Sequence, residues 1–459
     1  MHLFFKAAIV FVLTLAIVIP LTLIHGIVRD RQSYRAQAVA DVAQNVGGVQ
    51  TFAGPVLVVP YVETRTIVSD EEGKPIGKVE RTPGRWVFYP EDLRISGNLP
   101  TDVRTRGIHV VPVYQWDGDV AASFEATIPD NDPGTRRDIG EPWLSWEFSD
   151  PRGLQGTPAL TVNGAALKLQ PGAGFREGNG MHVRLQTPTA GTAIKLQTQL
   201  AIHLAGTQTF SFLPIGRDNR IDLSSDWAAP KFVGASPRRE ASGKGFIAHW
   251  RVSSLAANSR SGFPGERAIS QRGALPEAAT VEQELPGRIS IGLVDPVNAY
   301  SSIDRAIKYG LLFVAVTFAG FFLIEFLKRV PIHPIQYGLV GLAIAIFFLL
   351  LLSLSEHFTF GVSYLAAAAA CIGLIGFYLV AVLRGLWRGL AFTGLLTTLY
   401  GVLYGVLISE DNALVLGSGL LFLLLAAIMV ATRRVDWYAI SASRGRRAPQ
   451  ASGNDGAML

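Results

Sequence analysis

The chain has 459 residues, a formal net charge of +5 at pH 7 and 49% hydrophobic residues. These totals combine two populations, because residues 309–432 are almost uncharged whereas residues 28–308 contain the charges, glycines and prolines of a soluble domain. The basic excess does not indicate a nucleic-acid partner, since no stripe of Lys and Arg alternates with aromatic residues. The single cysteine, Cys371, lies in an apolar run, so the chain forms no internal disulfide.

Six apolar stretches are each long enough to cross a bilayer, whose hydrocarbon core of about 30 Å needs roughly 20 apolar residues. They cover residues 7–28, 309–327, 337–354, 360–383, 389–408 and 413–432. The first is followed by an Ala-x-Ala sequence that is typical of signal-peptide cleavage. That sequence lies beyond Arg29, Arg31 and Arg35, so we interpret the stretch as an uncleaved signal anchor, with a cleaved signal peptide as the alternative.

The charges of the short connections predict the orientation of the chain. Two connections and the C-terminal tail are basic, through Lys328, Arg329, Arg384, Arg388, Arg433 and Arg434, among others. The connections around Glu356 and Glu410 contain no Lys or Arg. The positive-inside rule therefore predicts that both termini are cytoplasmic and that residues 29–308 lie on the outer side.

The outer region is predicted to be rich in strands. Runs of β-branched and aromatic residues predict strands at 55–62, 85–89, 107–114, 210–213 and 288–293. Gly97-Asn98, Asp117-Gly118 and Asn163-Gly164 are typical of turns between them. This pattern predicts a sandwich-like antiparallel domain, and a division into two subdomains near residues 154–158 stays open.

Helices are expected at both ends of this domain. Val39, Val42 and Val46 have helical spacing, so the first membrane helix should continue outward until Gly47. At the other end, Ser301 or Ser302 can cap a helix that runs directly into the second span. The predicted fold is an α+β membrane protein with an anchor helix at 1–28, a β-rich domain at 29–308, a five-helix bundle at 309–432 and a cytoplasmic tail at 433–459.

Several segments that are not common motifs occur in a fixed order along nearly the whole chain. They are GP at 54–55, LPIGRDN at 213–219, SDW at 225–227, VDPVNAY at 294–300, HPIQY at 333–337 and VDWY at 435–438. In these features the sequence resembles the CreD family of bacterial inner-membrane proteins. The resemblance implies a multi-pass protein of the inner membrane, with residues 29–308 in the periplasm and a role in cell-envelope integrity. The resemblance does not imply an enzymatic activity.

The sequence contains no nucleophile elbow, zinc-helix motif, P-loop or dinucleotide fingerprint, so we predict no catalytic residue, no metal site and no cofactor. Charged residues within membrane spans are costly, and Glu325 lies inside the second span. We expect Glu325 to pair with Arg384 or Arg388, either as a structural ion pair or as a functional site. Glu356 and His357 form either an interfacial helix cap or a proton- or cation-binding pair.

In the outer domain, Trp227, His249 and Trp250 either line a ligand pocket or belong to a β core. In the bundle, Gly385-x-x-x-Gly389 and Gly401-x-x-x-Gly405 permit close helix approach, within one protomer or in a homodimer. The expected partners are the lipid bilayer and a periplasmic envelope component. Two functions follow from these observations: a non-enzymatic envelope protein that acts through its outer domain, or a transporter or lipid-handling protein that acts through its bundle.

Overall fold

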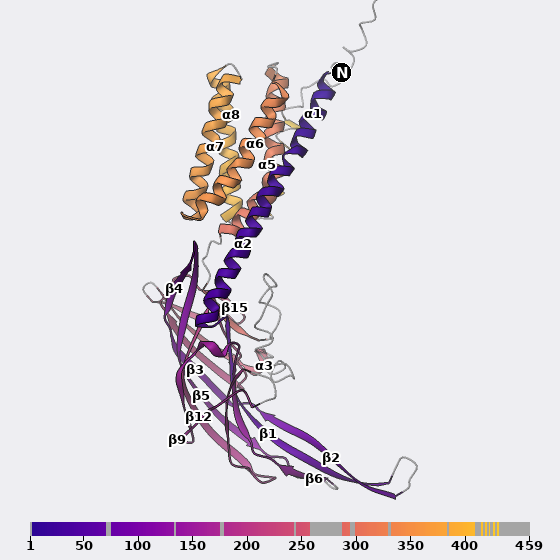
Figure 1. The fold of residues 1–459 in the computed structure, drawn as a ribbon, viewed down its shortest axis with the longest axis vertical. Helices are drawn as coiled ribbons and strands as arrows, with labels where there is room; N and C mark the ends of the chain where they lie inside the picture. Colours follow the sequence, from indigo (N-terminus) through magenta and orange to yellow (C-terminus); the bar gives the residue numbers. More distant parts are fainter. Residues whose placement is uncertain are drawn as a thin grey trace, which may run out of the picture. The chain divides into compact units, whose positions relative to one another are not determined.

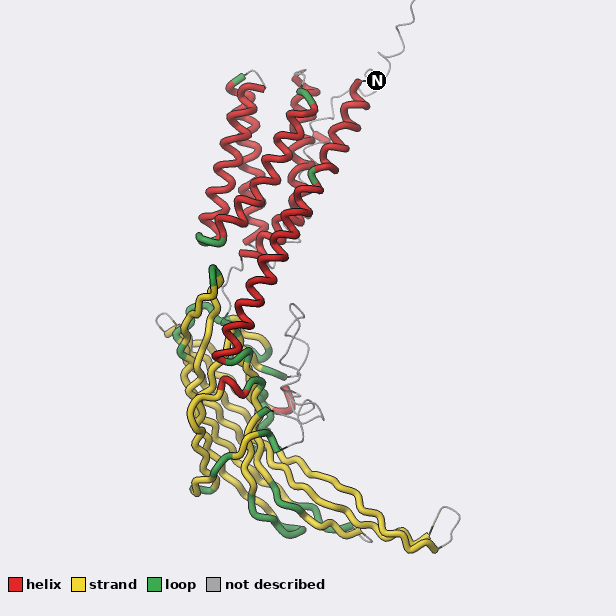
Figure 2. Tube along the Cα trace, viewed as in Figure 1, coloured by secondary structure: helices red, strands yellow, loops and turns green. Residues whose placement is uncertain are grey.

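The computed structural model describes residues 2–408 except 70–74, 133–134, 175–178, 243–244, 258–286, 294–298, 329–331 and 383–384, together with single residues between 415 and 430. Its contacts divide the chain into two compact units. A helical unit comprises Met1–Gln32 and Val297–Leu459, and a β unit comprises Ser33–Pro296. Figure 2 shows that the first consists of helices and the second almost entirely of strands.

The long helices follow the apolar stretches of the sequence (Figure 1). They are α1 (His2–Ala16), α2 (Val18–Val46), α5 (Ala299–Lys328), α6 (Pro334–Ser355), α7 (Phe360–Val382) and α8 (Leu386–Ile408). Five helices are long and apolar enough to cross a membrane within the described residues. The first five predicted spans are thereby confirmed as helices, and the sixth, at 413–432, lies largely outside the described residues.

Local sequence explains where several of these helices begin and end. α2 ends at Val46, where Gly47 has a φ of +104° that favours glycine, as the sequence predicted. α5 begins at Ala299 and continues without interruption to Lys328, which confirms the helix expected to lead into the second span. Ser301 and Ser302 lie inside this helix, so the prediction that one of them caps it is wrong. His333 caps α6, because its side chain accepts from the Ile335 amide while Gln336 accepts from the His333 amide. Within the helical unit, α5, α6, α7 and α8 contact one another in a ring, and α1 packs against α5 and α6.

The β unit consists of two nine-stranded sheets. The first sheet has the order β10-β11-β7-β1-β13-β18-β15, with β2 and β6 also paired to β1. Its strands are β1 (Gln50–Ser69), β2 (Pro75–Phe88), β6 (Thr135–Ile139), β7 (Trp143–Phe148), β10 (Gln170–Pro171), β11 (Gly180–Arg184), β13 (Thr209–Phe212), β15 (Lys231–Val233) and β18 (Ile289–Gly292).

The second sheet has the order β16-β17-β14-β3-β5-β12-β8-β9, with β4 also paired to β5. Its strands are β3 (Asp92–Leu99), β4 (Thr101–Arg106), β5 (His109–Thr127), β8 (Leu154–Val162), β9 (Ala165–Leu167), β12 (Ala193–Thr207), β14 (Asp218–Ser225), β16 (Arg238–Ser242) and β17 (Gly245–Ser253). Two short helical turns, Pro151–Gly153 and α3 (Ser254–Ala257), complete the described elements.

The sheets are not purely antiparallel, which corrects the prediction from sequence. β1 pairs with β13 in parallel, and β14 pairs with β3 in parallel, whereas the other pairs are antiparallel. Both parallel pairs join strands that are distant in sequence, so no local turn signal could reveal them. β8, which begins at Leu154, pairs with β12 in the second sheet, and the contacts keep Ser33–Pro296 in one compact unit.

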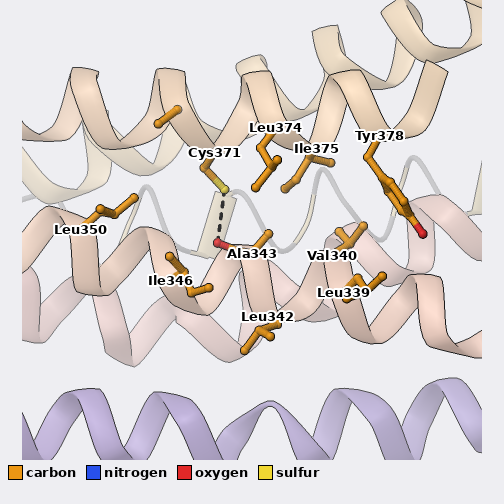
Figure 3. A pocket seen from close by; sticks show the side chains of 11 residues that line it. Leu339, Val340, Leu342, Ala343, Ile346, Leu350, Cys371, Leu374, Ile375 and Tyr378 are labelled. Carbon is orange, nitrogen blue, oxygen red and sulfur yellow. Dashed lines mark hydrogen bonds between the residues drawn. The ribbon is translucent and has the colours of Figure 1, made fainter. Parts of the chain in front are cut away.

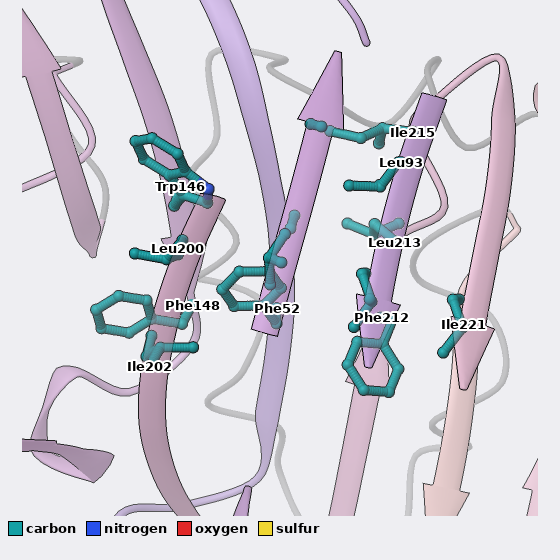
Figure 4. Packing of buried hydrophobic residues seen from close by; sticks show 14 of the residues in the cluster. Phe52, Leu93, Trp146, Phe148, Leu200, Ile202, Phe212, Leu213, Ile215 and Ile221 are labelled. Carbon is teal, nitrogen blue, oxygen red and sulfur yellow. The ribbon is translucent and has the colours of Figure 1, made fainter. Parts of the chain in front are cut away.

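The core of the β unit lies between the two sheets. Trp116 on β5 of the second sheet packs against Phe52, Phe210 and Phe212 of the first sheet, with ring-centroid distances of 5.1, 5.0 and 5.5 Å. Figure 4 shows Phe52 and Phe212 among the aliphatic side chains of this core, which include Leu93, Leu200 and Ile221. Burial of these large apolar side chains is the main force that holds the two sheets together.

Two of the predicted turns are strand interiors. Gly97 on β3 pairs with Gly118 on β5, and a Cβ atom on Gly118 would lie 2.3 Å from the Trp116 ring. These glycines therefore make room for an indole rather than reverse the chain. The third predicted turn is confirmed, because Asn163 and Gly164 have φ values of 52° and 81° between β8 and β9. Two positive φ values are what a tight hairpin turn requires.

Candidate functional site

Glu325 lies near the end of α5, and the structure gives it two partners on the chain that follows. Its carboxylate accepts a hydrogen bond from the Tyr337 hydroxyl over 2.9 Å and one from the Ile332 amide over 3.3 Å. Tyr337 is fully buried and stacks edge-on against Phe318. The carboxylate thus joins the end of α5 to the beginning of α6.

The expected partners of Glu325 cannot be placed beside it. Arg384 lies outside the described residues, and the side chain of Arg388 is likewise not described. The ion pair of Glu325 with one of these arginines therefore stays a prediction. Tyr337 was missed, although its position three residues after the Pro334 that starts α6 could have indicated a residue close to the end of α5.

Glu356 and His357 follow the end of α6, and the two side chains have different surroundings. Glu356 is the C-cap residue of α6, and its Oε1 lies 3.2 Å from Arg31 Nε on α2, in an ion pair without the alignment of a hydrogen bond. His357 is exposed and, within the described part of the chain, has no side-chain partner. The structure therefore links Glu356 to an arginine rather than to the neighbouring imidazole.

A second polar contact connects α2 with α5 in the helical unit. His25 Nδ1 lies 3.1 Å from one carboxylate oxygen of Asp304, and Lys308 Nζ lies 2.7 Å from the other. Together with the Arg31–Glu356 pair, it ties α2 to two other helices through partly buried charges. Sequence reasoning missed these contacts because the paired residues are more than 270 positions apart.

The three candidate residues of the β unit do not form one surface. Trp250 is 1% exposed, packs in the core and donates its indole N–H to the Ala235 carbonyl over 2.8 Å. His249 faces the other side of β17, where its Nδ1 lies 2.5 Å from Asp222 Oδ1. Trp227 is partly buried against the core. Trp250 is therefore a residue of the β core, and of the three candidates only His249 presents a polar group at the surface.

The exposed face of the second sheet carries a row of three arginines, which we call the arginine row. Arg220 on β14 lies directly opposite Arg251 on β17 and directly opposite Arg94 on β3. All three side chains are exposed, and none has an ion pair within the described residues. Like charges directly opposite one another across strands are destabilising.

Acidic rows lie on both sides of the arginine row, so the face is banded in charge. Asp218 is paired with Asp92 on one side, and Asp222 is aligned with Asp119 through Ser96 on the other. Two of these carboxylates also contact other side chains: Asp222 contacts His249, and Asp92 accepts a hydrogen bond from Ser123 over 3.5 Å. The banding was invisible in sequence, because it depends on the register of strands separated by more than 120 residues.

Another cross-strand contact on this face joins His203 to Asp117 over 2.7 Å. The Asp117 carboxylate accepts a hydrogen bond from Gln115 over 2.9 Å, and this bond and the one to His203 hold the pKa of Asp117 below its usual value. Both contacts come from β5 and β12, which are among the most extensively paired strands of the sheet.

Two cavities lie between helices, and both are lined by apolar side chains. One lies between α6 and α7 and has a volume of about 370 Å³; the other, between α5 and α8, measures about 20 Å³. Among the described residues, no three His, Cys, Asp or Glu side chains cluster in a way that could hold a metal ion.

These features define a class: a multi-pass membrane protein that carries a two-sheet β unit between its first and second spans. The chain matches the family model described as inner membrane protein CreD over residues 2–438. It is 34% identical over 456 residues to the inner membrane protein CreD of Escherichia coli (strain K12), covering 99% of this chain and 98% of that protein. The chain therefore belongs to the CreD family and is a multi-pass inner-membrane protein.

Some solved structures are distantly similar to the chain. Two crystal structures of mutant M1 zinc metallopeptidases from Deinococcus radiodurans match with TM-scores of 0.23 and 0.21 and identities of 11% and 12%. The matches span 45% and 36% of this chain and 42% and 38% of the peptidase chains. Likenesses at this level carry no argument about fold or activity.

Proposed function

We propose that this protein maintains cell-envelope integrity without enzymatic chemistry, and that its β unit binds or braces an envelope component in the periplasm. The proposal assigns both termini to the cytoplasm. It is supported by the basic connections around Arg329 and Arg388, in contrast to the acidic connections around Glu356 and Glu410. The helical unit then serves as the membrane anchor of the β unit.

The observation that carries the proposal is the arginine row. Arg94 and Arg220 are paired with strands on both sides, and Arg251 is paired with Arg220 on one side, so most of the backbone groups of the row are used within the sheet. A partner must therefore be recognised through side chains rather than by adding a strand. The unfavourable alignment of three guanidinium groups that have no ion pair among the described residues is offset if a polar partner with acidic groups binds across them.

The charge bands favour a partner that alternates acidic and hydrogen-bonding groups. The arginines would bind its carboxylates or phosphates, and Asp92, Asp218 and Asp222 would accept hydrogen bonds from its amide, amine or hydroxyl groups. An envelope polymer with acidic substituents has this chemistry.

The test is complementation of a deletion strain with a full-length variant in which Arg94, Arg220 and Arg251 are changed to Gln. We expect resistance to a detergent challenge to fall to the level of the deletion strain. The variant should be as abundant as the wild type and at least as stable to heat, since like-charge repulsion has been removed. A variant with Arg65→Gln, Arg81→Gln and Arg136→Gln changes three exposed arginines of the β1, β2 and β6 strands and serves as the matched control. Full resistance in the first variant would contradict the assignment of binding to this face.

A transporter or lipid-handling function of the bundle is the second candidate. Glu325 with Tyr337, and the cavity between α6 and α7, are the observations that favour it. The apolar lining of that cavity offers no path for a polar solute, so this candidate requires an apolar or lipid substrate.

A further inference from the structure

The cavity of about 370 Å³ between α6 and α7 has the walls of a hydrocarbon-binding site. Leu342 and Ile346 from α6 and Leu374 from α7 line it, and Tyr378 stands at one end. Figure 3 shows side chains from both helices projecting into the same space. Its size lies within the range of about 300–1,000 Å³ that is typical of small-molecule sites.

Small residues create the space, and a hydrogen bond fixes the helices around it. Ala343 and Ala370 line the cavity where larger side chains would fill it. The Cys371 thiol donates to the Ala343 carbonyl over 3.4 Å and accepts from the Tyr400 hydroxyl of α8 over 3.0 Å. The polar groups at the floor of the cavity thus satisfy one another, and an occupant meets hydrocarbon.

The mouth of the cavity opens beside exposed apolar side chains of two helices. α6 and α7 are both long and apolar enough to span a membrane, and Leu342, Ile346 and Leu374 are exposed beside the opening. A two-turn helix about 10 Å across and 11 Å long fills on the order of 900 Å³, so a helix can cover this cavity but cannot enter it. An unfilled cavity would lose the dispersion contacts of its walls, whereas a flexible chain restores them.

One polar group at the end of the cavity indicates how an occupant is oriented. Tyr378 lies four residues before the end of α7 and is half-buried. Its hydroxyl has no hydrogen-bond partner within the described residues. Tyrosines at the ends of spans commonly place their hydroxyl at the level of lipid head groups. The hydroxyl is therefore available to an ester or phosphate oxygen.

We propose that this cavity binds one acyl chain of a membrane phospholipid, whose head group lies where α6 begins and α7 ends and accepts a hydrogen bond from Tyr378. The site commits to a phospholipid rather than to a free hydrocarbon, because only the former satisfies that hydroxyl. It is independent of the role proposed for the β unit.

The test is photo-crosslinking in nanodiscs, with a phosphatidylglycerol that carries a diazirine midway along one acyl chain, followed by peptide mapping. Labelling of the segments 339–350 and 370–378 should exceed that of comparably exposed apolar positions on α8, such as Leu390 and Leu395, by about fivefold. Uniform labelling of all exposed apolar faces would overturn the proposal. Crosslinks from these segments to residues 413–432, or to a second copy of the chain, would overturn it in favour of a helix as the cover.

Matched variants separate the cavity from the general lipid surface. Ala370→Leu fills the cavity, whereas Ala369→Leu adds the same volume to an exposed neighbour on α7 that does not line it. Ala370→Leu should lower the labelling of these segments about fivefold, and Ala369→Leu should leave it unchanged; an equal effect of both would contradict the site. The wild-type map decides the question alone if Ala370→Leu does not fold.

The Tyr378→Phe variant tests the head-group contact. It should lower labelling by the phospholipid about threefold and leave labelling by a diazirine-bearing alkane unchanged. An unchanged phospholipid signal would overturn the assigned orientation, and equal labelling of the wild type by both probes would replace the phospholipid by any apolar chain.

Discussion

The Tyr337 hydroxyl donates a hydrogen bond to the Glu325 carboxylate over 2.9 Å, and this contact joins α5 to α6 inside a membrane-spanning bundle. A carboxylate in such surroundings is costly unless its oxygen atoms are hydrogen-bonded. The Ile332 amide supplies another donor at 3.3 Å, so one side chain near the end of α5 contacts two residues around the beginning of α6. The first two experiments below test this organisation.

Removing the phenol hydroxyl should destabilise the bundle. Hydrogen bonds to charged groups contribute about 1.5–3 kcal/mol, so Tyr337→Phe should lower the free energy of unfolding by about 2 kcal/mol. Thermal unfolding in detergent measures the effect. The double variant Tyr337→Phe/Glu325→Gln should lose less free energy of unfolding than the sum of the two single losses, because each substitution removes the same contact. Phe318→Leu is the control, because it changes the ring beside Tyr337 but not the contact with Glu325. Its loss of stability should add to that of Glu325→Gln.

The pairing of Glu325 with Arg384 or Arg388 is tested by the same kind of cycle. Glu325→Gln combined with Arg384→Gln, and separately with Arg388→Gln, should show a coupling of about 1 kcal/mol for the residue that forms the ion pair. Additive losses in both cycles would reject the pair and leave Tyr337 as the main partner.

Asp150 gives the β unit a dependence on acid. Its carboxylate accepts hydrogen bonds from the Gly48 amide over 2.9 Å and from the Arg152 guanidinium over 2.7 Å. Burial raises the pKa of Asp150, but these hydrogen bonds outweigh it and hold the pKa below its usual value. The stabilisation is therefore complete above the unfolded-state pKa of about 3.9 and is lost as the pH falls through the lower folded-state pKa.

We expect Asp150→Asn to lower the free energy of unfolding by about 1–2 kcal/mol at pH 7, and the difference from the wild type to shrink below about pH 4. Thermal unfolding of the full chain at several pH values between 3 and 7 measures both effects. Asp102→Asn, at an exposed position, is the control and should change little at any pH. A difference that is constant down to pH 3 would show that the charge of Asp150 is not the cause.

The glycine at position 118 is needed for packing rather than for a turn. A methyl group there would lie 2.3 Å from the Trp116 ring, so Gly118→Ala should cost about 1–3 kcal/mol through overpacking of the core. Ser96→Ala, on the opposite face of β3, should be nearly neutral and serves as the control. Equal stabilities of the two variants would mean that the indole can move aside without loss.

Gly118 also illustrates what the sequence could and could not predict. Long apolar stretches predicted the helices closely, because a span is defined by about 20 consecutive residues of one kind. A glycine beside an aspartate has the same local signature whether it turns the chain or accommodates a ring, so Asp117-Gly118 was interpreted wrongly. Only the pairing of β5 with β3 distinguishes the two cases.

The candidate sites also differ in whether local sequence or strand pairing defines them. Glu325 and Glu356 were identified because a charge in or beside an apolar stretch is a local anomaly. The arginine row escaped, since Arg94, Arg220 and Arg251 become neighbours only through the register of three strands, one pair of them parallel. For Trp250 the sequence left a ligand pocket and a β core as alternatives, and its burial in the structure decides for the core.

The orientation of the chain is open to a direct experiment. In a chain with Cys371→Ser, single cysteines at Asp119, which is exposed on the second sheet, and at Arg446, in the tail, should differ in their reaction with an impermeant thiol reagent. In intact spheroplasts we expect Asp119→Cys to be labelled and Arg446→Cys to be labelled only after lysis. The reverse pattern would place the β unit in the cytoplasm and remove the basis of the proposed envelope contact.

The final prediction separates the β unit from the bundle as the carrier of function. The β unit has its own core and forms a compact unit from Ser33 to Pro296, so we expect it to fold when α6, α7 and α8 are replaced by an unrelated anchor after α5. Such a chain should restore at least half of the envelope resistance of a deletion strain, since the polar recognition chemistry is retained. The same replacement with the three Arg→Gln changes of the arginine row should restore none. If the first chain is folded and correctly placed yet restores nothing, the bundle itself must act, and the lipid-handling function with the cavity between α6 and α7 becomes the better explanation.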